Sequence, residues 1–142
     1  MSLYQSEYEV KISFEDLDPL NVVWHGNYMR YMEQARCDLL EKIGYTYKDM
    51  KVDNIAYPIA KMNVKYIKPA EFGDVLTVKL DVISIEPTLD IKYTIFNKKT
   101  GDKIFEATTM QIGLDMTTKE TVYAPPIELV NAIKEASSGE KI

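Results

Sequence analysis

The sequence predicts an α+β protein in which a curved, five-stranded antiparallel sheet wraps around one long central helix. An amphipathic helical pattern follows the first strand-like segment, and most of the chain after residue 55 alternates as strands do. A helix and a sheet that each carry one apolar face bury those faces best against each other. With 142 residues, 46% of them hydrophobic, the chain suits one domain, and we expect residues 1–142 to form it.

The first strand is predicted over residues 8–14, where apolar and polar side chains alternate. The long helix is predicted over residues 28–43, because its apolar side chains recur at steps of three and four. These side chains are Tyr28, Tyr31, Met32, Ala35, Leu39 and Ile43. Asn27 is the expected N-cap of this helix, and Gly44 its left-handed exit. We expect Arg36 on its polar side and Cys37 packed as a small residue.

The remaining elements follow from alternation and turn residues. Residues 45–54 are polar and are expected to form a loop with at most one helical turn. Four strands connected as a meander are predicted over residues 56–67, 74–86, 89–97 and 103–116. The second of these shifts its apolar phase at Ile83, which predicts a β-bulge that curves the sheet. Two prolines introduce a final helix over residues 127–136, and residues 137–142 are expected to fray.

Composition excludes several classes of protein. No run of about 18 apolar residues predicts a membrane span, and the first residues lack the features of a secretory signal, so we expect a cytoplasmic protein without membrane insertion. The formal charge of −5 argues against general affinity for nucleic acid. A single cysteine allows no internal disulfide. One cysteine and one histidine also argue against a structural zinc site, which usually takes four such ligands, so we expect no metal.

The candidate active site lies between the first strand and the long helix. Residues 14–36 read FEDLDPLNVVWHGNYMRYMEQAR and contain the only histidine, His25, and the only tryptophan. The start of a helix offers unpaired N–H groups that attract an anion or the oxygen of a polarised carbonyl. An Asp-Pro turn adds the carboxylate of Asp18, so one loop can combine a nucleophile or base with electrophilic donors. The same residues also describe an ordinary turn that leads into a helix.

Two segments of the chain resemble a known family. Residues 16–36, in the pattern D-x-D-P-x-x-V-V-W-H-x-N-Y-x-R-Y-x-E-x-A-R, resemble the opening of the 4-hydroxybenzoyl-CoA thioesterase family. Residues 66–74 (YIKPAEFGD) are similar to a second segment of that family, and the match runs in order over residues 10–116. The resemblance implies a hot-dog fold and hydrolysis of a short-chain or aromatic acyl-CoA. It also implies a homodimer or homotetramer with sites between subunits, and no cofactor other than the coenzyme A of the substrate.

The resemblance also implies roles for individual residues. Asp18 matches the catalytic aspartate, which acts as nucleophile or general base on the thioester carbon. His25 matches the histidine of the Tol-Pal-associated branch; its backbone N–H would polarise the carbonyl, and its imidazole would orient substrate or protonate the leaving thiolate. Asp16 is a supporting residue. The candidate substrate-binding residues are Trp24, Asn27, Tyr28, Lys65 and Lys68. We expect the two lysines to contact the phosphates of coenzyme A.

Several alternatives stay open on the sequence. Asp18 can merely close its turn, His25 and Tyr28 can merely pack, and surface lysines are usually just solvated. An acyl-carrier-protein thioesterase is the nearest alternative enzyme, whereas the Asp-Pro turn disfavours a hot-dog dehydratase. A hot-dog protein that binds acyl-CoA without hydrolysing it is the alternative from another functional class.

Overall fold

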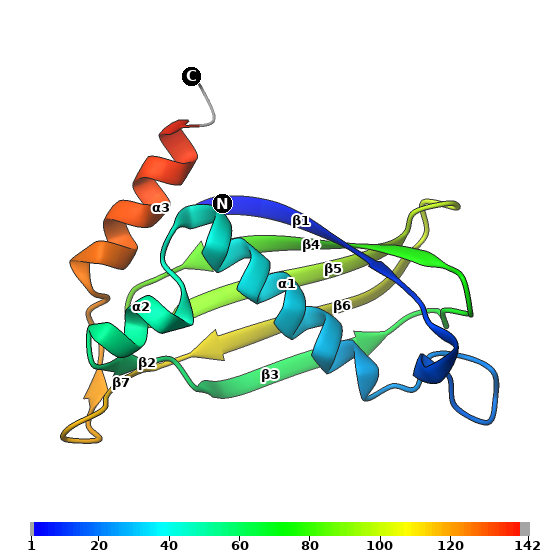
Figure 1. The fold of residues 1–142 in the computed structure, drawn as a ribbon, viewed down its shortest axis with the longest axis horizontal. Helices are drawn as coiled ribbons and strands as arrows, with labels where there is room; N and C mark the ends of the chain where they lie inside the picture. The colour runs from blue at the N-terminus through cyan, green and yellow to red at the C-terminus, as the bar shows by residue number, and fades with distance from the viewer. Residues whose placement is uncertain (1, 140–142) are drawn as a thin grey trace.

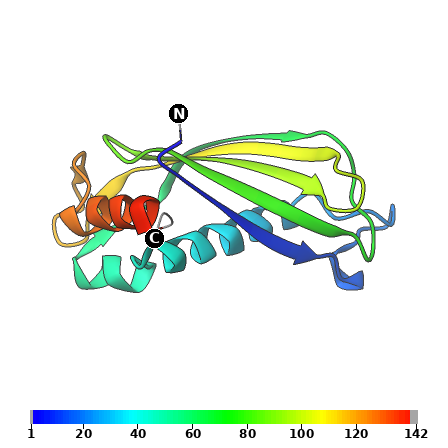
Figure 2. The same ribbon diagram turned by 90° about the horizontal axis from the view of Figure 1, so that it is seen from above.

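The computed structural model describes residues 2–139 and confirms the predicted fold class. A five-stranded antiparallel sheet with the order β1-β4-β5-β6-β3 curves over the long helix α1, as Figures 1 and 2 show from two directions. Its elements are α1 (Asn27–Ile43), β1 (Tyr4–Lys11), β3 (Ile59–Tyr66), β4 (Val75–Ser84), β5 (Leu89–Asn97) and β6 (Lys103–Gln111). The chain therefore forms the hot-dog architecture, in which the curved sheet wraps around the central helix.

Three short strands and two further helices gather at the C-terminal end of α1 (Figure 1). The strands β2 (Ile55–Ala56), β7 (Gly113–Asp115) and β8 (Thr121–Val122) form a small second sheet. The helices are α2 (Tyr47–Val52) and α3 (Ile127–Gly139). At the opposite end of α1 lie the short 3-10 helix η1 (Phe14–Asp16), which follows β1, and the loop that connects η1 to α1. The two ends of the central helix thus have very different surroundings.

The core lies between α1 and the inner face of the sheet. Tyr31, Ala35 and Leu39 of the helix are almost completely buried. The sheet contributes buried side chains at alternate positions of its strands, among them Leu76, Val78, Leu80, Ile91, Tyr93, Ile95 and Phe105. Burying one such aliphatic or aromatic side chain contributes about 1.5–3 kcal/mol. The contacts between these two faces hold α1 across the sheet.

Several predicted strand boundaries are wrong. The first strand begins at Tyr4 and ends at Lys11, and Phe14 is 75% exposed instead of packed in the core. The strand predicted over residues 103–116 is divided into β6 and β7. Only β4, β5 and β6 form a meander, because β3 pairs with β6 and β1 with β4. The predicted bulge is confirmed, since the pairing of β4 with β5 shifts register between Val82 and Ser84.

The helices also differ from the prediction in detail. Asn27 is the first residue of α1 and not its N-cap, a position that Gly26 occupies without a side-chain bond. Arg36 is buried instead of lying on the polar side, and Cys37 is exposed instead of packed, so both predictions are wrong. Gly44 does adopt the predicted left-handed conformation.

The polar stretch after α1 contains the short helix α2, which begins with a capping box. The last helix continues past its predicted end to Gly139, and the rest of the predicted frayed tail, residues 140–142, lies outside the described residues. None of the helices in residues 2–139 is long and apolar enough to cross a membrane.

Candidate active site

A closed turn brings the two predicted catalytic residues to the same end of α1. Residues 17–25, here called the Asp18 loop, begin with an antiparallel bridge between Leu17 and Val23. Within the turn, the N–H of Asp18 donates to the carbonyl of Val22 at 2.9 Å. At its base, the N–H of Trp24 donates to the carbonyl of Asp16 at 3.0 Å. Asp18 and His25 therefore lie close to the hydrogen bonds that join the two segments of this loop.

The carboxylate of Asp18 is only partly used by its own turn. Its Oδ1 accepts the N–H of Leu20 at 2.8 Å, which is the turn-closing role that the sequence allowed. No residue in the described part of the chain donates a hydrogen bond to its other oxygen, Oδ2. One carboxylate oxygen is thus available to a substrate or a water molecule.

A pocket with a volume of about 290 Å³ opens beside this loop. It contains four of the predicted site residues, Asp18, His25, Tyr28 and Lys68. The complete lining is Asp18, Val22, Val23, His25, Tyr28, Tyr66, Ile67, Lys68 and Pro69. Segments from the Asp18 loop, the first turn of α1 and the end of β3 therefore meet at one cavity.

Aromatic side chains form the wall of the pocket next to the sheet. The Tyr28 ring stacks on Phe105 with centroids 4.7 Å apart, and the Tyr66 ring meets Tyr28 edge to face at 5.5 Å. The Tyr66 hydroxyl donates to the carbonyl of His25 at 2.9 Å. Burial raises the pKa of Tyr28 to about 12, with the nearby Tyr66 and Asp74 adding to the effect. Tyr28 is therefore a neutral phenol at physiological pH.

The start of α1 leaves several backbone donors unpaired. Within residues 2–139, the N–H groups of His25, Gly26 and Tyr28 have no hydrogen-bond acceptor. A Cβ on Gly26 would lie 2.4 Å from the ring of Trp24, so any larger residue at this position would have to displace that ring. These donors stand at the positive end of the helix dipole, where negative charge is stabilised.

A model of the thioesterase-like superfamily matches residues 12–135. The chain belongs to this superfamily. It is 27% identical over 139 residues to the 1,4-dihydroxy-2-naphthoyl-CoA hydrolase of Thermosynechococcus vestitus, covering 94% of each chain. It is 29% identical over 79 residues to the acyl-CoA thioester hydrolase YbgC of Escherichia coli, covering 56% of this chain and 59% of that one.

The fold is also that of solved thioesterases. The structure of the DHNA-CoA thioesterase from Staphylococcus aureus matches with a TM-score of 0.83 and 26% identity, covering 96% of this chain and 93% of that one. A 4-hydroxybenzoyl-CoA thioesterase structure matches with a TM-score of 0.79 at 19% identity, which is a likeness of fold. The resemblance seen in two segments of the sequence therefore extends over nearly the whole chain.

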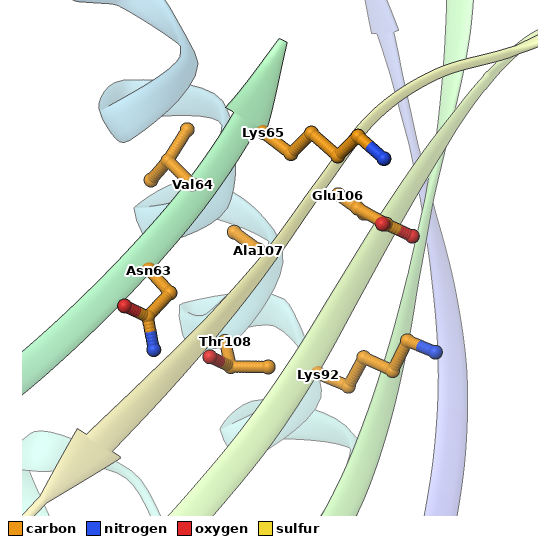
Figure 3. Close-up of a pocket in the computed structure, with 7 residues that line it drawn as sticks. All are labelled: Asn63, Val64, Lys65, Lys92, Glu106, Ala107 and Thr108. Atoms are coloured by element: carbon orange, nitrogen blue, oxygen red, sulfur yellow. The ribbon is translucent and has the colours of Figure 1, made fainter. Parts of the chain in front are cut away.

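Three of the predicted substrate-binding residues lie away from the pocket of this superfamily member. The Trp24 ring is half exposed and packs on Gly26, and the Asn27 amide is engaged by the carbonyl of Asp16 at 2.8 Å. Lys65 lies in a separate shallow pocket with Lys92 and Glu106 (Figure 3). Because neighbouring residues of a strand face opposite sides, Lys65 lies on the outer face of the sheet while Tyr66 reaches the site.

Asp16 is the best-connected residue beneath the site. Asp16 is 4% exposed, and its carboxylate accepts the N–H of Ser13 at 2.9 Å and pairs with Arg30 of α1. Burial opposes ionisation of Asp16, but the bonds from Ser13 and Arg30 outweigh it and lower the pKa of this carboxyl. Asp16 is therefore an anion that links the segment before the loop to α1.

Two residues of the site were missed from sequence. Tyr66 opens the second family-like segment, so the signal for it was present but was not assigned a role. Arg30 is one of several charged residues between the apolar positions of the helix, and nothing in the helical spacing distinguishes it from the others. No group of three or more His, Cys, Asp or Glu side chains among residues 2–139 is arranged to hold a metal ion.

Proposed function

We propose that the chain hydrolyses acyl-CoA thioesters at the pocket beside Asp18. One observation carries the proposal: residues that line the same pocket supply both a free carboxylate oxygen, on Asp18, and unpaired backbone donors, on His25 and Tyr28. The names of the relatives, which act on acyl-CoA thioesters, support this substrate class. The reaction consumes water and releases a carboxylic acid and the thiol of coenzyme A.

In the proposed mechanism the thioester oxygen accepts hydrogen bonds from the start of α1. The carbonyl carbon then becomes more electrophilic, and the charge that develops on the oxygen is stabilised by fixed donors. Asp18 attacks this carbon directly or removes a proton from the attacking water; both routes need the ionised carboxylate. His25 is the exposed last residue of the Asp18 loop and lines the pocket, where its imidazole can orient substrate or protonate the departing thiolate.

Lys68 is our candidate for contact with the phosphates of coenzyme A. It lines the pocket, is exposed, and its Nζ lies 3.3 Å from Asp102, a surface pair of small energetic value. A phosphate can therefore replace Asp102 at little cost. We assign no such role to Lys65 within one chain, because it lies on the other face of the sheet.

We further propose that two copies pair to complete the site. The strand β3 is an edge of the sheet, and nearly all of its residues are exposed, including Ile59, Met62 and Tyr66. An edge strand with exposed apolar side chains is suited to pairing with another strand. Tyr66 at the end of β3 lines the pocket, so such a dimer would place its interface beside the site. Light scattering across protein concentrations tests this, and a monomer at all concentrations would contradict it.

The decisive experiment measures thiol release from short, long and aromatic acyl-CoA substrates by the wild type and Asp18→Asn. The amide can still accept the N–H of Leu20, so we expect unchanged folding and a loss of kcat of about 10²–10⁴-fold. A parallel binding assay separates the alternatives. Tight binding without turnover by the wild type would indicate a non-catalytic acyl-CoA-binding protein, and turnover only of acyl-carrier-protein substrates would indicate the alternative enzyme. Equal activity of both proteins would overturn the role of Asp18.

A further inference from the structure

Asp16 lies at the junction of the loop and the helix, where its oxygens accept four hydrogen bonds. Its side chain binds the N–H of Ser13 at 2.9 Å and the guanidinium of Arg30. Its carbonyl accepts the N–H of Trp24 at 3.0 Å and the side-chain amide of Asn27 at 2.8 Å. We call Asp16, Asn27 and Arg30 the Asp16 clamp, since the last two belong to the first turn of α1 and the first does not.

The clamp determines where the Asp18 loop stands relative to the helix. Asp18 follows Asp16 by two residues, and His25 comes directly after Trp24, which is bonded to Asp16. The returning segment of the loop has a second attachment, because the N–H of Val23 donates to the carbonyl of Ala70 at 2.8 Å. The distance from the Asp18 carboxylate to the unpaired donors at the helix start therefore depends on the bonds of Asp16.

Burial makes the clamp sensitive to the loss of a partner. The Asp16 side chain is 5% exposed, whereas the Arg30 side chain is 49% exposed and lies over the Tyr31 ring, 5.2 Å from its centroid. A buried carboxylate without a cation is strongly disfavoured, so removal of Arg30 drives Asp16 either to take up a proton or to move toward water. Any such movement carries the base of the Asp18 loop with it.

We infer that Asn27 and Arg30, acting through Asp16, are positioning residues that hold Asp18 at the correct distance from the donors at the helix start. The inference rests on the proposed function for its effect on turnover. It assigns to Arg30 and Asn27 a role in kcat without any contact between them and the substrate. It also predicts a structural signature that does not depend on activity.

That signature comes from Trp24, the only tryptophan of the chain, which is bonded to Asp16 at the base of the loop. Its fluorescence and its quenching by acrylamide report the state of the loop directly. We expect both Arg30→Ala and Asn27→Asp to increase quenching of Trp24, because the first removes the cation and the second cannot donate to the Asp16 carbonyl. The matched control is Lys42→Met, which breaks the 2.9 Å pair with Asp38 at the other end of α1.

The kinetic expectation is a loss of kcat by about 10–100-fold with KM changed less than about threefold, because misplacement of a reacting group by about 1 Å has effects of this size. Guanidinium at millimolar concentration should restore part of the kcat of Arg30→Ala, since the site of Arg30 is half exposed. Lys42→Met should match the wild type in kcat and in quenching. Circular dichroism establishes that each variant is folded.

The outcomes separate this inference from the proposed function. Unchanged quenching in both clamp variants overturns it, whether or not the protein hydrolyses any acyl-CoA. A loss of kcat without a change at Trp24 also overturns it, because Arg30 or Asn27 would then act on the substrate itself. Increased quenching together with a selective loss of kcat supports it, and an inactive wild type with increased quenching in the variants supports the clamp while rejecting the proposed function.

Discussion

The two ends of α1 differ in whether their polar groups have hydrogen-bond partners. At its N-terminal end, backbone donors and an Asp18 oxygen have no partner among residues 2–139, and the pocket beside them is open. In its C-terminal half, Arg36 is 5% exposed and fully enclosed by other elements. Its Nε donates to the Tyr47 hydroxyl at 2.7 Å, and its Nη1 to the Tyr93 hydroxyl at 3.0 Å.

The buried arginine is held by neutral oxygens. No carboxylate in the described part of the chain lies within ion-pair distance of Arg36. Burial opposes the charge of Arg36, whereas electrostatic interaction and hydrogen bonding with Tyr93 and Tyr47 favour it, so the pKa of this guanidinium lies above its ordinary value. Thr109 and Gln111 donate to the same two hydroxyls and extend the network into β6. The polar groups around Arg36 are therefore bonded to one another within the fold, whereas those at the N-terminal end of α1 remain available to a ligand.

Replacing Arg36 should give the largest effect on stability. Arg36→Met leaves the hydroxyls of Tyr47 and Tyr93 without their charged donor, so we expect unfolding to require roughly 3 kcal/mol less free energy. The Asp18 loop lies at the other end of the helix, so kcat should stay within about twofold of the wild type as long as the protein is folded. Urea unfolding and a thiol-release assay measure the two quantities. A large loss of kcat at unchanged stability would remove the distinction between the two ends.

A smaller effect on stability is expected from the N-cap of α2, which lies near the C-terminal end of α1. The Thr46 side chain accepts the N–H of Asp49, and the Asp49 carboxylate accepts the N–H of Thr46 at 2.8 Å. Thr46→Ala removes half of this capping box and should lower stability by about 1 kcal/mol. Thermal unfolding followed by circular dichroism measures it, and turnover should be unchanged. A loss of activity instead would connect α2 to the site.

The smallest effect on global stability should come from protonation of Asp16, near the N-terminal end of α1. Asp16 has a folded pKa below its unfolded value of about 3.9, so its contribution is fully present above that value. The contribution is lost as the pH falls through the lower folded pKa. We therefore expect quenching of Trp24 to rise below about pH 4 before circular dichroism reports global unfolding. Asp16→Asn should show raised quenching already at neutral pH, and a wild-type profile in that variant would contradict the assignment.

Much of the fold could be predicted because it depends on local periodicity. The long helix was placed within one residue of α1, since its apolar spacing and Gly44 mark it clearly. The bulge near Ile83 was also found, because a phase slip is visible in the sequence. The start of β1 was missed because Ser6 interrupts the apolar alternation although it is buried. Its end was misplaced because Asp16, through its bond to Ser13, turns the chain earlier than alternation indicates.

The sequence by itself determined the helix, the strands, the superfamily resemblance and the loop that carries Asp18 and His25. Only the tertiary structure decided which strands are neighbours, that Tyr66 and not Lys65 lines the pocket beside Asp18, and that Arg36 is buried while Cys37 is exposed. The physical reason is the range of the interactions. Periodicity records which face of an element is apolar, whereas a buried charge such as Arg36 is possible only when hydroxyls from distant elements, on α2 and β5, converge on it.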